Sequence, residues 1–139
     1  LLSCSPLIAL APSLLPYPFH SGLPLDPITP ELRILLLANG NTARDNPHFD
    51  PWPVLKWFNP CGAATWLITE LDPDDEDIAY GLADLGLGSP EIGHLSVRAL
   101  ASIRLMGGTL DIERDLHWRA DKPLSAYARL ARAAGRIVS

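Results

Sequence analysis

The feature that most constrains the fold is a series of short apolar runs, separated by turn residues, between positions 54 and 95. The runs are VLKWF (54–58), ATWLITEL (64–71), IAYGLADLG (78–86) and EIGHL (91–95), and Asn-Pro, Asp-Pro and Ser-Pro pairs lie between them. Short runs rich in β-branched and aromatic residues are typical of strands, and Pro beside Asn, Asp or Ser marks turns. Because short turns join strands that run in opposite directions, the pattern predicts an antiparallel sheet.

Helical patterns lie on both sides of this region. Thr29 is a good N-cap, Pro30 suits the first helical position, and Asn39-Gly40 is a typical helix end. The remaining pattern predicts helices over 30–38, 97–104 and 122–135 and a fifth strand over 109–118. We therefore expect an α+β domain with a mainly antiparallel sheet of about five strands and about three helices packed on one face. The residues expected in its core are Trp66, Leu67, Leu82, Leu100, Leu124 and Tyr127.

The first part of the chain has a different composition. Seven of the fourteen prolines lie in the first thirty residues, and the first charged residue is Asp26. Repeated proline blocks helices and interior strands, so residues 1–27 are predicted to be an extended arm outside the fold. The rest, 28–139, is predicted to be a single domain. No apolar run is long enough for a membrane span.

Charge is divided unevenly along the chain, which has a formal net charge of −5. Residues 57–97 hold eight acids and no Lys or Arg, whereas residues 98–139 hold eight bases and four acids. An acidic surface could meet a protein partner with a basic surface, or the two regions could be ordinary solvated faces that partly neutralise each other. Direct nucleic-acid binding is not expected from an acidic chain. The oligomeric state is left open.

The densest acidic segment, DPDDED (72–77), does not match a calcium-binding loop. An EF-hand loop that began at Asp72 would need glycine at its sixth position and glutamate at its twelfth, and this chain has Asp77 and Ala83 there. We expect a hairpin turn instead, with the side chains of residues 74–77 in solvent. Zinc-ligand spacings and phosphate-binding glycine motifs are also absent from the sequence, so no metal or cofactor is predicted.

Acids outside the turn are better candidates for a site. If the turn is centred on Asp75, Glu70 lies opposite Tyr80. Trp66 then lies opposite Asp84, whose carboxylate would be costly among leucines unless it is paired. The candidate binding residues are Glu70, Asp84, Glu91 and His94. They could form a polar pocket, or a hydrogen-bonded structural cluster around the GLGSP turn.

A small enzyme is the alternative function. Asp115 and His117 would share one face of the predicted fifth strand, where a carboxylate can pair with a histidine. Cys61 in the NPCGA turn could supply a nucleophile. The weak catalytic candidates are Asp84, Glu91, His117 and Cys61. Two cysteines cannot build a disulfide scaffold, so a reduced, cytoplasmic setting is expected.

The strings WFNPCGAATWLITELDPDDEDIAYGLADLGLGSPEIGHLSVRAL and ERDLHWRADKPLSAYARLARAAGRIV resemble a small bacterial family of unknown function. Its members often occur on plasmids and other mobile elements, and the resemblance covers about residues 28–138. Where the family pattern reads PELGYVSL, this chain reads PEIGHLSV, so His94 replaces a tyrosine. The resemblance implies a bacterial accessory protein and supplies no activity, cofactor or catalytic residue. We therefore expect a small acidic-faced protein-interaction module, with a hydrolase-like enzyme as the alternative.

Overall fold

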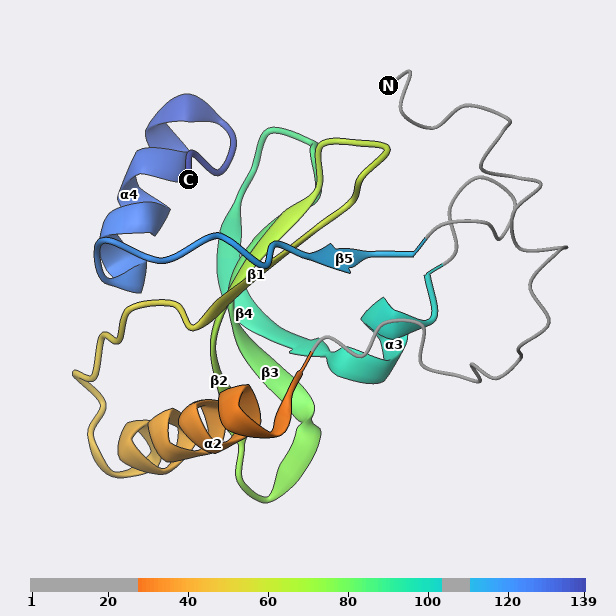
Figure 1. The fold of residues 1–139 in the computed structure, drawn as a ribbon. Coiled ribbons are helices and arrows are strands. Elements are labelled where there is room, and N and C mark those ends of the chain that lie inside the picture. The colour runs from red at the N-terminus through yellow and green to blue at the C-terminus, as the bar shows by residue number, and fades with distance from the viewer. Residues whose placement is uncertain (1–27, 104–110) are drawn as a thin grey trace, which may run out of the picture.

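The structure is a computed structural model that describes residues 28–103 and 111–139 (Figure 1). Its elements are α2 (Pro30–Asp45), β1 (Leu55–Phe58), β2 (Thr65–Asp72), β3 (Asp75–Asp84), β4 (Glu91–Ser96), α3 (Val97–Ala101), β5 (Glu113–Arg114) and α4 (Leu124–Ala134). The strands form one five-stranded sheet in the order β4-β3-β2-β1-β5, and every pair is antiparallel. The predicted α+β class is therefore confirmed. The predicted arm, 1–27, lies outside the described residues.

The helices lie on both faces of the sheet, so the expectation that all three pack on one face is wrong. Strand β2 is buried on both sides, because Trp66 and Leu67 point to opposite faces and both are apolar. Trp66 belongs to the cluster under α2 and α3, and Leu67 to the cluster under α4. Figure 1 shows α4 well separated from α2 and α3.

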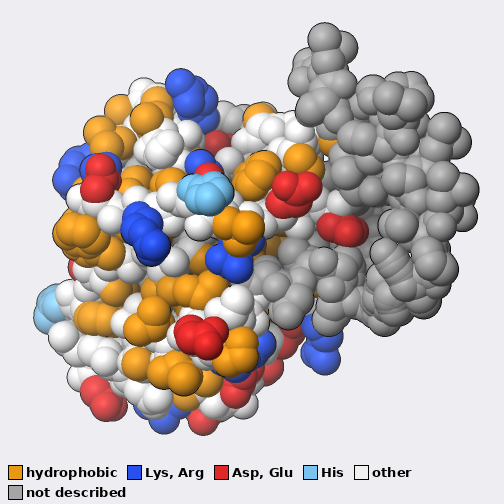
Figure 2. Space-filling model, viewed as in Figure 1, with side chains coloured by type: hydrophobic (Ala, Val, Ile, Leu, Met, Phe, Trp, Pro, Cys, Tyr) orange, Lys and Arg blue, Asp and Glu red, His pale blue; other side chains and the backbone are white. Residues whose placement is uncertain are grey.

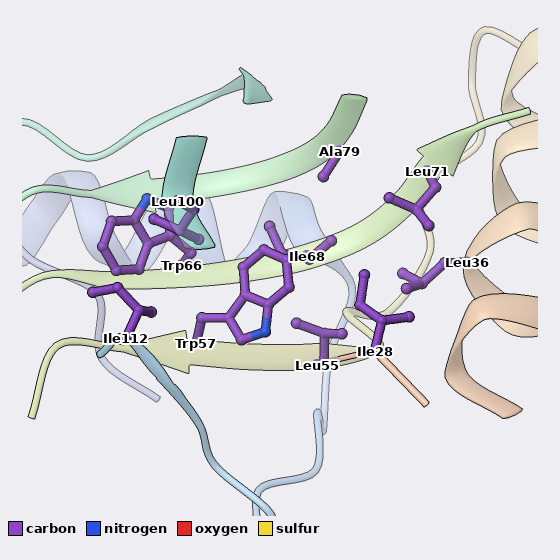
Figure 3. Close-up of a cluster of buried hydrophobic side chains, with 10 residues drawn as sticks. All are labelled: Ile28, Leu36, Leu55, Trp57, Trp66, Ile68, Leu71, Ala79, Leu100 and Ile112. Atoms are coloured by element: carbon purple, nitrogen blue, oxygen red, sulfur yellow. The ribbon is translucent and has the colours of Figure 1, made fainter. Parts of the chain in front are cut away.

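All six residues predicted for the core are buried, but they are divided between the two clusters. Figure 3 shows the larger cluster, in which side chains from β1, β2 and β3 meet those of both helices on that face. Its members are Ile28, Leu36, Leu55, Trp57, Trp66, Ile68, Leu71, Ala79, Leu100 and Ile112. The smaller cluster contains Leu67, Leu82, Leu124, Tyr127, Ala128, Ala131 and Ile137. The sheet is therefore the middle layer of three.

Helix α2 begins as predicted but runs past the expected stop. Thr29 Oγ1 accepts a hydrogen bond from Leu32 N–H at 3.2 Å, which confirms the N-cap. The helix continues through Asn39-Gly40 to Asp45. A Cβ on Gly40 would lie 2.0 Å from the Leu71 carbonyl oxygen, so this glycine allows close contact with β2. Asn39 Nδ2 donates to Thr69 O at 2.8 Å, which ties the helix to the same strand.

Gly40→Ala is expected to destabilise the protein by about 1–3 kcal/mol, because the added methyl group collides with backbone. Helix propensity alone predicts the opposite, a gain of about 1 kcal/mol. Urea unfolding of the wild type and the variant distinguishes the two. Gly93→Ala is the matched control, since a Cβ there meets no atom within 4 Å. A stabilised Gly40→Ala variant would mean that α2 and β2 do not approach this closely.

A β-bulge at Thr69 changes the register of the β2–β3 hairpin. Glu70 lies opposite Tyr80, as predicted, but Trp66 lies opposite Ala83 rather than Asp84. The register shifts between Ile68 and Glu70, so one residue of β2 is left without a partner. The shift also reverses the alternation of faces, since Ile68 and Leu71 both join the larger cluster. Glu70 is thereby placed on the opposite face.

Two strands end earlier than predicted for local reasons. β3 stops at Asp84, because Asp84 Oδ1 accepts a hydrogen bond from Gly86 N–H and Gly86 has a φ of 83°. β5 has only two residues, and Asp115 Oδ1 then accepts from His117 N–H in a tight turn. Part of the predicted fifth strand, 109–110, lies outside the described residues.

No described helix is both long and apolar enough to cross a membrane.

Candidate functional site

Three side chains form a row across β2, β3 and β4 at the hairpin end of the sheet. Glu70 pairs in register with Tyr80, and Tyr80 pairs in register with His94. Residues directly opposite one another in antiparallel strands place their side chains on the same face. The Tyr80 and His94 rings confirm this contact, with centroids 4.9 Å apart and a tilt of 56°. The bulge at Thr69 brings Glu70 into this row.

The row lines a cavity of about 310 Å³, here called the hairpin pocket. It lies between the last turns of α2 and the β2–β3 hairpin, and its lining combines charged, aromatic and small residues. The lining residues are Gly40, Ala43, Arg44, Glu70, Asp72, Pro73, Asp74, Ile78, Tyr80 and His94. Its volume is near the lower end of the range for small-ligand sites, which fits one amino-acid side chain better than a large cofactor.

Glu70 is an acid of the hairpin pocket whose pKa is shifted by its surroundings. Burial raises the pKa of its carboxyl above 4.5, and this effect exceeds the opposing effects of the Thr69 hydroxyl and of His94. Thr69 Oγ1 donates to Glu70 Oε1 at 3.2 Å. Within the described part of the chain, no other hydrogen bond to this carboxylate is found. Acceptor capacity is therefore left for a donor that enters the pocket.

The acids of the hairpin turn are largely paired within the chain. Arg33 Nη1 contacts Glu76 Oε1 at 2.8 Å, and Arg44 Nη2 lies 3.4 Å from Asp74 Oδ1. Both arginines belong to α2, so this helix neutralises part of the acidic segment. Figure 2 shows the same tendency on the face it presents, where acidic and basic side chains are interspersed among apolar ones. The acidic turn is therefore not a continuous field of one sign.

Asp77 was predicted to lie in solvent with the other turn acids, and that prediction is wrong. Its side chain is only 17% exposed. Asp77 Oδ1 accepts from Arg98 N–H at 2.7 Å, and Oδ2 accepts from Ser96 Oγ–H at 2.7 Å. These bonds, first that from Arg98 N–H and then that from Ser96, lower its pKa below 3.8. Asp77 thus fixes the N-terminus of α3, where a carboxylate is favourable.

Asp77→Ala is expected to lower the free energy of unfolding by about 1 kcal/mol at neutral pH, the usual effect of losing a cap. Because the folded pKa is depressed, this stability is present above the unfolded pKa and is lost as pH falls through the folded pKa. Urea unfolding at neutral and acidic pH should therefore show the two proteins converging in acid. Glu91→Ala is the control, since Glu91 is an exposed acid on β4. A difference that persists unchanged in acid would exclude this role.

The four predicted binding residues do not form one pocket. Glu70 and His94 line the hairpin pocket together. Asp84 lies at the other end of β3, buried, with Oδ1 accepting from Gly86 N–H and Oδ2 from Ile137 N–H, both at 2.8 Å. Glu91 is exposed and lies three residues from His94 on β4, so strand alternation places it on the opposite face.

The remaining catalytic candidates also lie apart. His117 is exposed in the loop after β5, and Asp115 binds its backbone N–H instead of pairing with its ring. Asp115 Oδ2 lies 4.0 Å from Lys56 Nζ. Cys61 lies in the β1–β2 turn, where its N–H donates to Asn59 Oδ1 at 2.7 Å. No cysteine of the described residues is free, so Cys61 offers no thiol nucleophile in this structure.

Arg44 is the pocket residue that the sequence patterns did not indicate. The Asn39-Gly40 pair predicts a helix end, which would leave residues 41–45 outside the helix. Continuing the helix by one turn would have placed Arg44 beside the hairpin.

The described residues contain no group of three or more His, Cys, Asp or Glu side chains that could hold a metal ion.

Comparison with known proteins gives one match. A family model described as "Protein of unknown function (DUF2958)" matches residues 27–138. No curated protein and no solved structure matches the chain.

Proposed function

We propose that this chain, which belongs to the DUF2958 family of proteins of unknown function, is a small protein-interaction module whose hairpin pocket receives a basic side chain of a partner protein. One observation carries the proposal: Glu70 is a partly buried carboxylate with unused acceptor capacity, and it lines a cavity. A buried charge is costly unless it is paired. A Lys or Arg side chain from a partner would supply that pair.

The other charges of the pocket favour the same ligand. Asp72 and Asp74 are carboxylates on its rim, and Arg44 contributes a single cation that already contacts Asp74 at 3.4 Å. Carboxylates thus outnumber cations in the lining. The aromatic ring of Tyr80 offers a surface for the aliphatic stem of a long basic side chain and for its charged end. The complementarity is confined to the pocket, since α2 and α3 pair other acids of the turn.

The proposed setting is a bacterial cell that carries plasmids or other mobile elements. The resemblance of the sequence supports this setting, and in it the partner would be a DNA-handling or defence enzyme with a basic surface. Direct binding of nucleic acid is not part of the proposal, because the chain is acidic overall and the proposed pocket is rich in carboxylates.

A small enzyme is the second candidate function, and one observation favours it. Glu70 has a raised pKa and shares its pocket with His94, an arrangement that suits proton transfer. The hydrolase-like version that uses Asp84, Glu91, His117 or Cys61 lacks this support, because those residues lie apart. The loss of a measurable hydrolytic activity in both Glu70→Gln and His94→Gln would favour the enzyme.

The test is a titration of the protein with peptides that contain one lysine or one arginine, followed by pull-down from the native host. Glu70→Gln should weaken peptide binding at least roughly tenfold, because a hydrogen-bonded ion pair is lost. The same variant should fold normally. Burial raises the Glu70 pKa, so its ionised form costs stability above that pKa, and an uncharged Gln relieves this cost.

Glu91→Gln is the matched control, because it removes the same charge from an exposed position on the opposite face. It should bind the peptides and the host partner like the wild type. Binding that persists in Glu70→Gln, or that falls equally in both variants, would overturn the proposed role of the pocket.

A further inference from the structure

A second cavity lies beside α4. It has a volume of about 320 Å³ and is called the α4 pocket here. Its walls include the Trp118 and Tyr127 rings and the side chains of Leu130 and Val138, which are 45% and 43% exposed. The Trp118 and Tyr127 ring centroids lie 6.0 Å apart. The pocket therefore has exposed apolar side chains, Leu130 and Val138, beside two aromatic rings.

Most polar groups of this pocket are already bonded to one another. Tyr127 Oη donates to Asp121 Oδ1 at 2.9 Å and accepts from Asp121 N–H at 3.0 Å. The Lys122 ammonium contacts the Asp121 carboxylate and lies 4.3 Å from the centroid of the Tyr127 ring. This network holds the wall in place before any ligand arrives, which reduces the cost of binding.

Arg119 is the exception. It lines the pocket and is exposed, and within 28–103 and 111–139 its guanidinium makes no ion pair. A guanidinium binds a carboxylate through two parallel hydrogen bonds. The exposed Asp121 carboxylate at the same pocket would repel a second negative charge. Lys122 is paired with Asp121, so Arg119 is the cation left for a ligand. Beside an apolar wall it favours a ligand with one negative charge and an apolar body.

We propose that the α4 pocket is a second ligand site, which binds an apolar group that carries a single carboxylate. Arg119 holds the carboxylate, while Leu130, Val138 and the aromatic wall cover the apolar part. Such a group is found in a free monocarboxylic acid and at the C-terminal residue of a peptide. The site does not depend on the hairpin pocket, because none of its lining residues is shared.

The test is an NMR titration that follows the Trp118 indole N–H. The probes are N-acetyl-leucine, its amide, and a short peptide that ends in leucine with a free carboxylate. The acid should bind at least roughly tenfold more tightly than the amide, because only the acid can pair with Arg119. Arg119→Gln should reduce acid binding to the level of the amide. A peptide that binds more tightly than the acid identifies a chain terminus as the ligand, and equal binding identifies a small acid.

Arg129→Gln is the matched control, since Arg129 is exposed on α4 but does not line the pocket. It should leave acid binding unchanged, and so should Glu70→Gln in the hairpin pocket. Equal binding of acid and amide, an equal loss in Arg119→Gln and Arg129→Gln, or no indole shift with any probe would overturn the proposal. Circular dichroism of each variant confirms that the fold is intact.

Discussion

Replacing Leu82 with alanine is expected to lower the free energy of unfolding by about 2–5 kcal/mol. Leu82 is 0% exposed and lies on β3 between Leu67 of β2 and Ile92 of β4. Its side chain belongs to the cluster that joins the sheet to α4. The α4 face of that cluster includes Ala128 and Ala131, whose short side chains cannot move into a void. A cavity should therefore remain after truncation.

The measurement is urea unfolding at constant m-value, and Leu87→Ala is the matched control. Leu87 is 82% exposed, so the same truncation there should change stability by less than about 0.5 kcal/mol. Leu124→Ala, on the helix side of the same cluster, should fall in the range expected for Leu82→Ala. A cost below about 0.5 kcal/mol at both Leu82 and Leu124 would contradict the packing of α4 on the sheet.

The sequence predicted those features that depend on local chemistry. The hairpins follow from short apolar runs between proline-containing turns, and the N-cap of α2 follows from Thr29. α4 was also predicted closely, because its Leu and Ala residues repeat at helical spacing and Gly135 ends it in the left-handed region, with a φ of 77°. In each case the residues that decide the structure are neighbours along the chain.

Features that depend on contacts between distant segments were missed. Gly40 is a common helix terminator, and only the nearby Leu71 carbonyl explains its place within α2. Thr69 is an ordinary strand residue, so nothing in its neighbourhood indicates a bulge. Its hydroxyl is 3.2 Å from Tyr80 O, a contact that exists only in the folded hairpin. The placement of α4 on the second face was not predicted either, because it depends on contacts with β2 and β3, which are distant from α4 in the sequence.

The candidate site also combines features that local sequence predicts with features that depend on distant contacts. Glu70 lies opposite Tyr80 as predicted, although the turn is not centred on Asp75. Asp72 pairs with Asp75, and a second register shift, between Leu71 and Asp72, brings Glu70 opposite Tyr80. His94 lines the same pocket as Glu70, because β4 pairs with β3. Arg44 was missed with the last turn of α2. Asp84 was recognised as a carboxylate that needs partners, and its bond to Gly86 N–H fits the structural alternative rather than the pocket.

Asp84→Ala is expected to cost about 3 kcal/mol, because two backbone N–H groups lose a charged acceptor. The carboxylate is 2% exposed, and it joins segments that are far apart in sequence. Oδ1 accepts from Gly86 N–H, which closes the turn after β3. Oδ2 accepts from Ile137 N–H, which holds the segment after α4 against the sheet. Ile137 is itself buried in the smaller cluster, so its packing depends on this bond.

Hydrogen exchange separates this role from a general loss of stability. In Asp84→Ala the amide of Ile137 should exchange much faster than amides in the centre of β3, because its acceptor is gone while the strand pairing remains. Asp84→Asn should be intermediate, since an amide oxygen can accept one N–H while the amide NH₂ faces the other donor. Glu91→Ala, on the neighbouring strand and exposed, should change stability by less than about 0.5 kcal/mol. A neutral Asp84→Ala would instead return Asp84 to the functional candidates, because a buried carboxylate without a structural role needs another explanation.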